Sequence, residues 1–187
     1  TGPVAGNPLE VTVDVENTGD DADDRTVELT TPGLGSDSTT VSLGGGESTS
    51  ETLSLSTGEG DAGEYTVTVD SGDDSDTRDA TVLAPAAFTV DITGTNNPVA
   101  GGPLNVTVAV ENTGDETGTQ TVELSAPGLG SDSVEVKELD GGESTTEELS
   151  LSTREGDAGE YTVTVQTNNN EATATATVSE PAGDGDT

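Results

Sequence analysis

Carboxylates are almost the only groups in this chain of 187 residues that could do acid–base or metal chemistry. The sequence has 38 Asp and Glu, four Lys and Arg, and no histidine or cysteine. A nucleophile–base pair of the Ser-His or Cys-His kind cannot be built from these residues. Paired carboxylates could serve a glycosidase, but in so acidic a chain such pairs arise by chance. A glycosidase would also need aromatic platforms for its sugar, and the chain has only two tyrosines and one phenylalanine. We therefore expect no catalytic residue and no enzymatic activity.

Two segments concentrate the hard oxygen donors that Ca²⁺ prefers. They contain the weak candidate calcium ligands Asp20, Asp21, Asp23, Asp24, Asp70, Asp73, Asp74 and Asp76. Neither segment has the EF-hand spacing, with its central glycine and terminal glutamate. The surface charge of an acidic protein accounts for the same residues, so we predict no cofactor and keep calcium as the alternative.

The remaining local motifs bear on partners and location. The four basic residues are scattered among carboxylates, so we expect no binding to nucleic acid, whose phosphates need clustered Lys and Arg. No apolar stretch is long enough to span a bilayer, and no signal peptide leads the chain. Asn105-Val-Thr107 is an N-glycosylation sequon, and Asn105 lies between apolar Leu104 and Val106, which predicts an outward side chain. If the protein is exported, we expect a glycan at Asn105.

A tandem repeat organises these residues. Pro3 to Val13 (PVAGNPLEVTV) returns 95 positions later as Pro98 to Val108 (PVAGGPLNVTV). The offset becomes 96 around Lys137-Glu138, and a gain of one residue within a strand predicts a bulge or a longer turn. Self-similarity at a fixed period means one folding unit copied head to tail. The predicted domains are residues 1–84, residues 85–182 and an acidic polar tail at 183–187.

Alternating apolar residues predict the fold of each copy. Leu9, Val11, Val13 and Val15 alternate with polar residues, and similar short runs follow between Gly- and Pro-rich turns. Several short strands at regular spacing predict two tandem immunoglobulin-like antiparallel β-sandwiches, all-β, with about seven strands each.

The only two tyrosines sharpen this prediction. Tyr65 and Tyr161 each end an Asp-Ala-Gly-Glu-Tyr motif at the start of a penultimate strand. That position is typical of a structural tyrosine corner, in which the ring packs in the core and the hydroxyl bonds to upstream backbone.

The two copies differ at their beginnings. Residues 88–93 (FTVDIT) precede the shared motif only in the second copy, so the first appears to lack its first strand. One interpretation makes Thr1 a boundary within a longer protein. The other is strand complementation, in which another subunit fills the open edge and builds a head-to-tail fibre. The tail from Ser179 onward lacks alternating apolar residues and makes a poor donor. The expected partners are other copies of the chain or neighbouring domains of a surface protein.

Three motifs carry a resemblance to a known family. They are the Val-x-Val-x-Asn-Thr-Gly strand end at 13–19 and 108–114, the Leu-x-x-Gly-Glu-Ser turn at 43–48 and 139–144, and the Gly-x-Tyr-Thr-Val-Thr-Val strand at 63–69 and 159–165. With these the chain resembles the cell-adhesion-related immunoglobulin-like domains of bacterial and archaeal surface proteins, called CARDB. The resemblance covers nearly the whole chain and implies a spacer or adhesion module on an exported protein. The chain departs from the family in its extreme acidity and its few aromatic core residues.

Net charge adds a prediction about the environment. The formal charge is −34, and repulsion within such a charge opposes folding unless salt screens it. Molar salt shortens the screening length to about 3 Å and removes most of this repulsion. We therefore predict an extracellular, cell-surface structural protein of a halophilic archaeon, a rigid stalk or filament subunit. The alternative is a binding module attached to an exported enzyme or capturing an extracellular partner.

Overall fold

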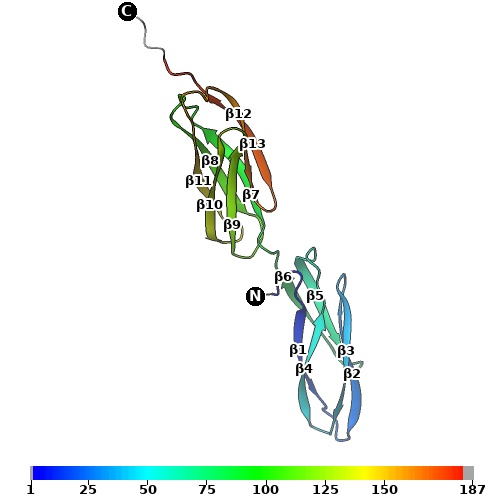
Figure 1. Cartoon of the computed structure of the whole chain (residues 1–187). Helices are drawn as coiled ribbons and strands as arrows, with labels where there is room; N and C mark the ends of the chain where they lie inside the picture. Colours follow the sequence, from blue (N-terminus) through cyan, green and yellow to red (C-terminus); the bar gives the residue numbers. More distant parts are fainter. Residues whose placement is uncertain (1, 183–187) are drawn as a thin grey trace, which may run out of the picture. The chain divides into compact units, whose positions relative to one another are not determined.

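Antiparallel strands and their turns make up the computed structural model, which describes residues 2–182. The chain divides between Pro85 and Ala86 into two compact units (Figure 1). We call residues 2–85 unit 1 and residues 86–182 unit 2, and describe each by itself. The predicted all-β class with two immunoglobulin-like units is confirmed. Thr1 and the predicted tail at 183–187 lie outside the described residues. Residues 2–182 contain no helix long and apolar enough to cross a membrane.

Unit 1 is a sandwich of a two-stranded and a four-stranded sheet. Its six strands are β1 (Leu9–Glu16), β2 (Asp23–Thr31), β3 (Gly35–Leu43), β4 (Ser48–Leu55), β5 (Gly63–Asp70) and β6 (Ser75–Val82). One sheet has the order β1-β4 and the other β3-β2-β5-β6, with every neighbouring pair antiparallel.

Unit 2 repeats this plan with one strand more. Its seven strands are β7 (Phe88–Thr95), β8 (Pro103–Asn112), β9 (Gly118–Ala126), β10 (Gly130–Leu139), β11 (Ser144–Ser152), β12 (Gly159–Gln166) and β13 (Glu171–Val178). The sheets have the orders β11-β8-β7 and β10-β9-β12-β13. The additional strand, β7, pairs along the free side of β8. In the described part of unit 1 no strand holds the corresponding place beside β1.

The cores follow the period-two patterning of the strands. In β8 the side chains of Leu104, Val106, Val108 and Val110 are fully buried, while the residues between them are less buried and point the other way. Burying one Val or Leu side chain contributes about 1.5–3 kcal/mol. The core of unit 1 follows the same pattern, with Leu29 of β2 and Leu53 of β4 buried.

The extra residue of the second copy forms a β-bulge. The register between β9 and β10 shifts between Val136 and Leu139, and Glu138 takes a positive φ of 49°. The Glu138 amide donates to the Thr119 hydroxyl at 3.2 Å. The bulge predicted around Lys137-Glu138 is confirmed, and it accommodates the extra residue without displacing the rest of the strand.

Candidate functional site

The repeated Pro-Val-Ala-Gly segment fastens the beginning of unit 1 to its end. The Leu83 amide donates to the Pro3 carbonyl at 2.8 Å, and the Ala5 amide donates to the Leu83 carbonyl at 2.9 Å. Val4 and Leu83 thereby form a parallel bridge outside the main strands. Ala5 is buried beneath it.

Unit 2 makes the same pair of bonds with the second copy of the motif. The Ser179 amide donates to the Pro98 carbonyl, and the Ala100 amide donates to the Ser179 carbonyl, both at 2.8 Å. Val99 and Ser179 form the matching parallel bridge. We call each set, Pro3–Ala5 with Leu83 and Pro98–Ala100 with Ser179, an entry–exit clamp.

A threonine at the end of a core strand holds each entry segment from a second side. In unit 1 the Gly6 amide donates to the Thr57 hydroxyl at 2.9 Å, and that hydroxyl donates to the Asn7 carbonyl at 2.7 Å. In unit 2 Thr153 accepts from the Gly101 amide at 3.0 Å and donates to the Gly102 carbonyl at 2.7 Å. Gly6 and Gly101 have φ angles of 93° and 94°, which a side chain would strain.

The parallel direction of each clamp determines how it carries force. Because the two segments run the same way, the chain enters at one end of the bridge and leaves at the other. Pulling on the two ends therefore slides the segments past each other and loads both hydrogen bonds together, rather than opening them one at a time. An arrangement of this kind suits a module that bears tension.

An asparagine anchors the corner that follows β1 in unit 1 and β8 in unit 2. The Asn112 side chain is fully buried, and its Nδ2 donates to the carbonyls of Glu116 at 2.8 Å and Leu139 at 2.9 Å. Its Oδ1 accepts from the amides of Gly114 at 3.1 Å and Ala87 at 3.2 Å.

Asn17 is the counterpart in unit 1 and makes three of these four bonds. Its Nδ2 donates to the Asp21 and Leu43 carbonyls, and its Oδ1 accepts from the Gly19 amide at 3.0 Å. The repeated Asn-Thr-Gly motif is thus a structural corner rather than a ligand site.

The two tyrosines sit in matching corners. The Tyr65 hydroxyl donates to the Asp61 carbonyl at 2.8 Å, and the Tyr161 hydroxyl donates to the Asp157 carbonyl at 2.9 Å. Each half-buried ring lies beside a turn glycine of the Pro-Gly-Leu-Gly motif, Gly33 in unit 1. Both hydroxyls are therefore engaged in holding the turn before a strand.

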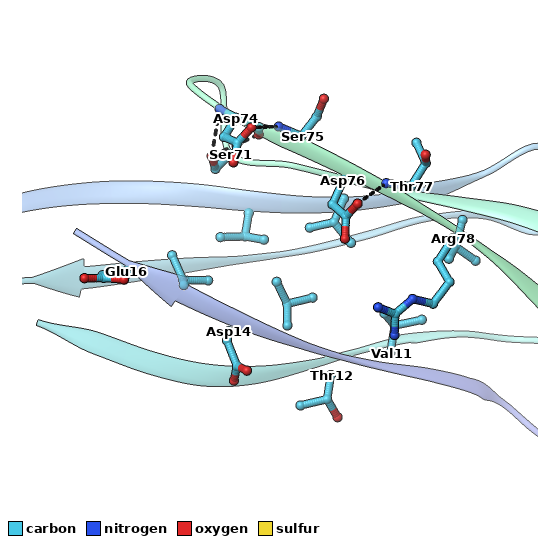
Figure 2. A pocket seen from close by; sticks show the side chains of 15 residues that line it. Val11, Thr12, Asp14, Glu16, Ser71, Asp74, Ser75, Asp76, Thr77 and Arg78 are labelled. Atoms are coloured by element: carbon cyan, nitrogen blue, oxygen red, sulfur yellow. Dashed lines mark hydrogen bonds between the residues drawn. The ribbon is translucent and has the colours of Figure 1, made fainter. Parts of the chain in front are cut away.

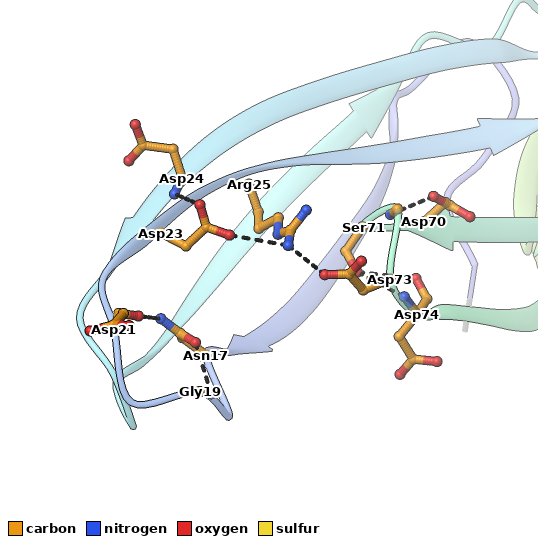
Figure 3. A network of polar contacts seen from close by, with 11 residues as sticks. Asn17, Gly19, Asp21, Asp23, Asp24, Arg25, Asp70, Ser71, Asp73 and Asp74 are labelled. Atoms are coloured by element: carbon orange, nitrogen blue, oxygen red, sulfur yellow. Dashed lines mark hydrogen bonds and ion pairs between the residues drawn. The ribbon is translucent and has the colours of Figure 1, made fainter.

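The acidic candidate ligands lie in two loops of unit 1 that an arginine connects. The Arg25 guanidinium contacts the Asp23 carboxylate at 3.1 Å and also pairs with Asp73 across the loop after β5 (Figure 3). Other carboxylates of these loops accept from nearby backbone amides, as Asp70 does from Gly72 at 2.7 Å and Asp74 from Ser75 at 2.9 Å.

These contacts do not assemble a cation site from the predicted residues. Among residues 2–182 no group of three or more His, Cys, Asp or Glu side chains is placed to hold a metal ion. The candidates Asp20, Asp21, Asp23, Asp24, Asp70, Asp73, Asp74 and Asp76 are spread over the loop between β1 and β2, the start of β2, the end of β5, the turn between β5 and β6, and β6. The carboxylates are dense in the sequence, but they do not converge on one point in the structure. Several of them are bonded to Arg25 or to backbone amides instead.

Asn105 lies on the polar face of β8, as its position between two buried residues requires. Its side chain is half-buried and bonded to the neighbouring strand, since Nδ2 donates to Glu148 at 3.3 Å and Oδ1 accepts from Ser150 at 2.9 Å. A glycan at Asn105 would have to replace the bond from Nδ2 to Glu148.

Family models match both halves of the chain. Residues 85–179 match the model described as CARDB, and residues 6–82 match a domain of unknown function, DUF7407. None of the curated proteins compared with the chain matches it significantly.

Solved structures similar to the chain come from several kinds of protein. A transglutaminase of red sea bream is 15% identical with a TM-score of 0.39, and the match covers 97% of this chain and 30% of that one. A Dscam structure concerned with isoform specificity is 17% identical with a TM-score of 0.27, covering 97% of this chain and 43% of that one. Domains 4 and 5 of the S-layer protein SbsC are 15% identical with a TM-score of 0.37, covering 82% and 97%. The chain thus spans less than half the length of the first two.

Proposed function

The chain belongs to the CARDB family, whose model covers residues 85–179, and from this premise we propose that it is a structural protein of the cell surface whose two units bear tension as spacers. The observation that carries the proposal is the entry–exit clamp, which recurs with the same bonds in both units. Because both units have the clamp, a pull on the two ends of the chain loads a pair of parallel backbone hydrogen bonds in each unit.

Composition supports a setting outside the cell and in concentrated salt. With a net charge of −34, the chain repels itself strongly at low ionic strength. Molar salt shortens the range of this repulsion to about 3 Å and leaves the exposed carboxylates to keep the surface hydrated. We infer that the protein works on the surface of a halophilic archaeon, as a stalk or as a subunit of a filament.

The chemistry of the described residues supports a role without catalysis. Both tyrosine hydroxyls are bonded to backbone carbonyls, and the acidic loops hold their carboxylates on amides and on Arg25. Adhesion through neighbouring surface domains or through other copies of the chain is the interaction that fits this proposal. A second candidate, a binding module for an extracellular partner, is favoured by one observation, a groove of about 460 Å³ along β1.

Single-molecule force spectroscopy on the whole chain in 3 M salt tests the tension-bearing role. We expect two separate unfolding steps, each releasing about 300 Å of chain at roughly 3.5 Å per residue. The variant Ala100→Pro removes the amide that donates to Ser179. It is expected to lower the unfolding force of one step only, and Ala5→Pro is expected to lower the force of the other.

Thr162→Ser changes an exposed residue of β12 away from the clamp and is expected to leave both forces unaltered. If Ala100→Pro folds normally and both of its steps occur at the original force, the clamp does not bear the load and the proposal is wrong.

A further inference from the structure

Unit 1 has an open groove between the edge of one sheet and the edge of the other. It lies between β1 on one side and β5 and β6 on the other (Figure 2). The groove has a volume of about 460 Å³. Its apolar floor consists of Val11, Val13 and Val15 of β1 with Val67 and Val69 of β5.

In unit 2 the corresponding place is filled by β7. This strand pairs with β8 so that Val90 lies opposite Val110 and Ile92 opposite Val108. With β7 in place, five core positions of unit 2 are 0% exposed, namely Val106, Val108, Val110, Val165 and Ala176. Their counterparts in unit 1, Val11, Val13, Val15, Val69 and Ala80, are only half-buried. The same side chains therefore exist in unit 1 without the strand that would cover them.

Polar groups that hold β7 in unit 2 also have counterparts around the groove. Three side chains form hydrogen bonds with β7 or with Ala87, the residue before it. Asn112 accepts from the Ala87 amide, and Asn170 accepts from the Val90 amide at 3.0 Å. Thr167 donates to the Phe88 carbonyl at 3.1 Å.

At the matching positions unit 1 has Asn17 and Asp74, whose side-chain oxygens can accept a hydrogen bond, and Ser71, whose hydroxyl can donate one. Ser71 and Asp74 line the groove (Figure 2). Unit 1 thus keeps both the apolar floor and the polar anchors of a strand site.

We propose that this groove is an acceptor site for one added β-strand, contributed by polypeptide outside residues 1–187. Every strand of residues 2–182 already has its place in a sheet, so none of them is available without unfolding its own unit. An added strand would form backbone bonds with the free edge of β1 and bury the three valines. The inference does not depend on the tension-bearing role, since the groove would accept a strand in a binding module as well.

Two differences between the units define which strand fits. In unit 2 Gly118 leaves room for the first apolar side chain of β7, because a Cβ there would come within 2.8 Å of the Phe88 ring. Unit 1 has Asp23 at that position, held by Arg25. The strand that enters unit 1 therefore begins with a small residue where β7 has Phe88.

The side of the groove formed by β6 is charged. Asp76 and Arg78 line it, where β13 of unit 2 has Ala172 and Ala174 packed against the core (Figure 2). Residues 2–182 show no ion pair for Arg78 within 4.0 Å, so an incoming carboxylate could pair with it. The acceptor is thus selective for a strand with two central apolar residues, a small first residue and an acidic group.

Peptide binding to the whole chain tests the proposal. The probe is a nine-residue peptide with the sequence of residues 87–95 (AFTVDITGT) altered by Phe88→Ala, and the matched control also replaces Val90 and Ile92 by Ser. The readout is hydrogen exchange in 3 M salt. We expect the probe at saturation to slow exchange of the edge amides of β1 at least tenfold, to leave unit 2 unchanged and to bind more tightly than the unaltered β7 sequence. The Ser-substituted peptide is expected to have no effect.

A pair of protein variants separates groove binding from general effects. Val13→Asp places a charge in the groove and is expected to abolish the protection, whereas Thr52→Asp, at an exposed position of β4 outside the groove lining, is expected to retain it. Slow exchange of β2 amides confirms that unit 1 of each variant is folded. If no peptide protects β1 while unit 1 is folded, the proposal is overturned. If β1 becomes protected without peptide as the chain dimerises, the occupant is a second copy and the proposal of an outside strand is equally overturned.

Discussion

A buried hydroxyl without a partner makes the stability of unit 1 open to improvement. Thr31 closes β2 with 1% of its surface exposed, and its Oγ1 has no hydrogen-bond partner. The matching residue of unit 2 is Ala126, which is buried without any polar side-chain atom. Thr31→Val keeps the branched shape and replaces the hydroxyl by a methyl group.

The expected gain follows from two contributions. A buried hydroxyl without a hydrogen bond costs about 1–3 kcal/mol, and a newly buried methyl group contributes about 0.8 kcal/mol. Allowing for imperfect packing, we expect unit 1 to become about 2 kcal/mol more stable. At 1.4 kcal/mol for each factor of ten, this slows exchange of its most protected amides about 30-fold.

Hydrogen exchange resolved along the chain measures this change separately in the two units. Thr31→Val should slow exchange in β2 and β5 and leave β9 and β12 as they are. In unit 2, Ala126→Thr places the same hydroxyl at the matching buried position and should exchange faster than Ala126→Val by a similar factor. If Thr31→Val leaves unit 1 unchanged or destabilises it, then the Thr31 hydroxyl has a partner in solution and the reasoning fails.

Three further predictions concern the corners and the charge. Tyr65→Phe and Tyr161→Phe should each lower the free energy of unfolding of their own unit by about 1–1.5 kcal/mol, because a half-buried carbonyl loses its donor; exchange that rises equally in both units would contradict this. Asn112→Ala should destabilise unit 2 by about 3 kcal/mol, because the Asn112 side chain is fully buried and makes four hydrogen bonds. Asn17→Ala should destabilise unit 1 by less, because Asn17 is half-buried and makes three. Denaturant titration monitored by hydrogen exchange can check both values. Lowering the salt from 3 M to 0.1 M lengthens the screening distance to about 10 Å and should reversibly lower the midpoint of thermal unfolding, measured by circular dichroism. A midpoint that does not depend on salt would contradict the argument from net charge.

Local periodicity was sufficient to predict the strands, because a strand with one buried face must alternate. Leu104 to Val110 in β8 alternate as the sequence requires, and the gain of one residue near Glu138 correctly indicated a bulge. Residues 88–93 alternate in the same way, and they form most of β7.

The clamps could not be predicted in the same way. Their partners, Leu83 and Ser179, differ in type and contribute only backbone atoms, so no side-chain pattern marks them. The groove shows the same limit, because the charged residues Asp76 and Arg78 face it only through the pairing of β5 with β6. Contacts between distant backbone segments depend on the closed fold rather than on local composition.

Immunogold electron microscopy of intact cells in molar salt tests the central claim most directly. An antibody against residues 85–179 is applied before and after the cells are made permeable. We predict dense labelling of the outer surface of intact cells, with little increase after permeabilisation. Labelling that appears only after permeabilisation would place the chain inside the cell and contradict its role as a structural protein of the cell surface.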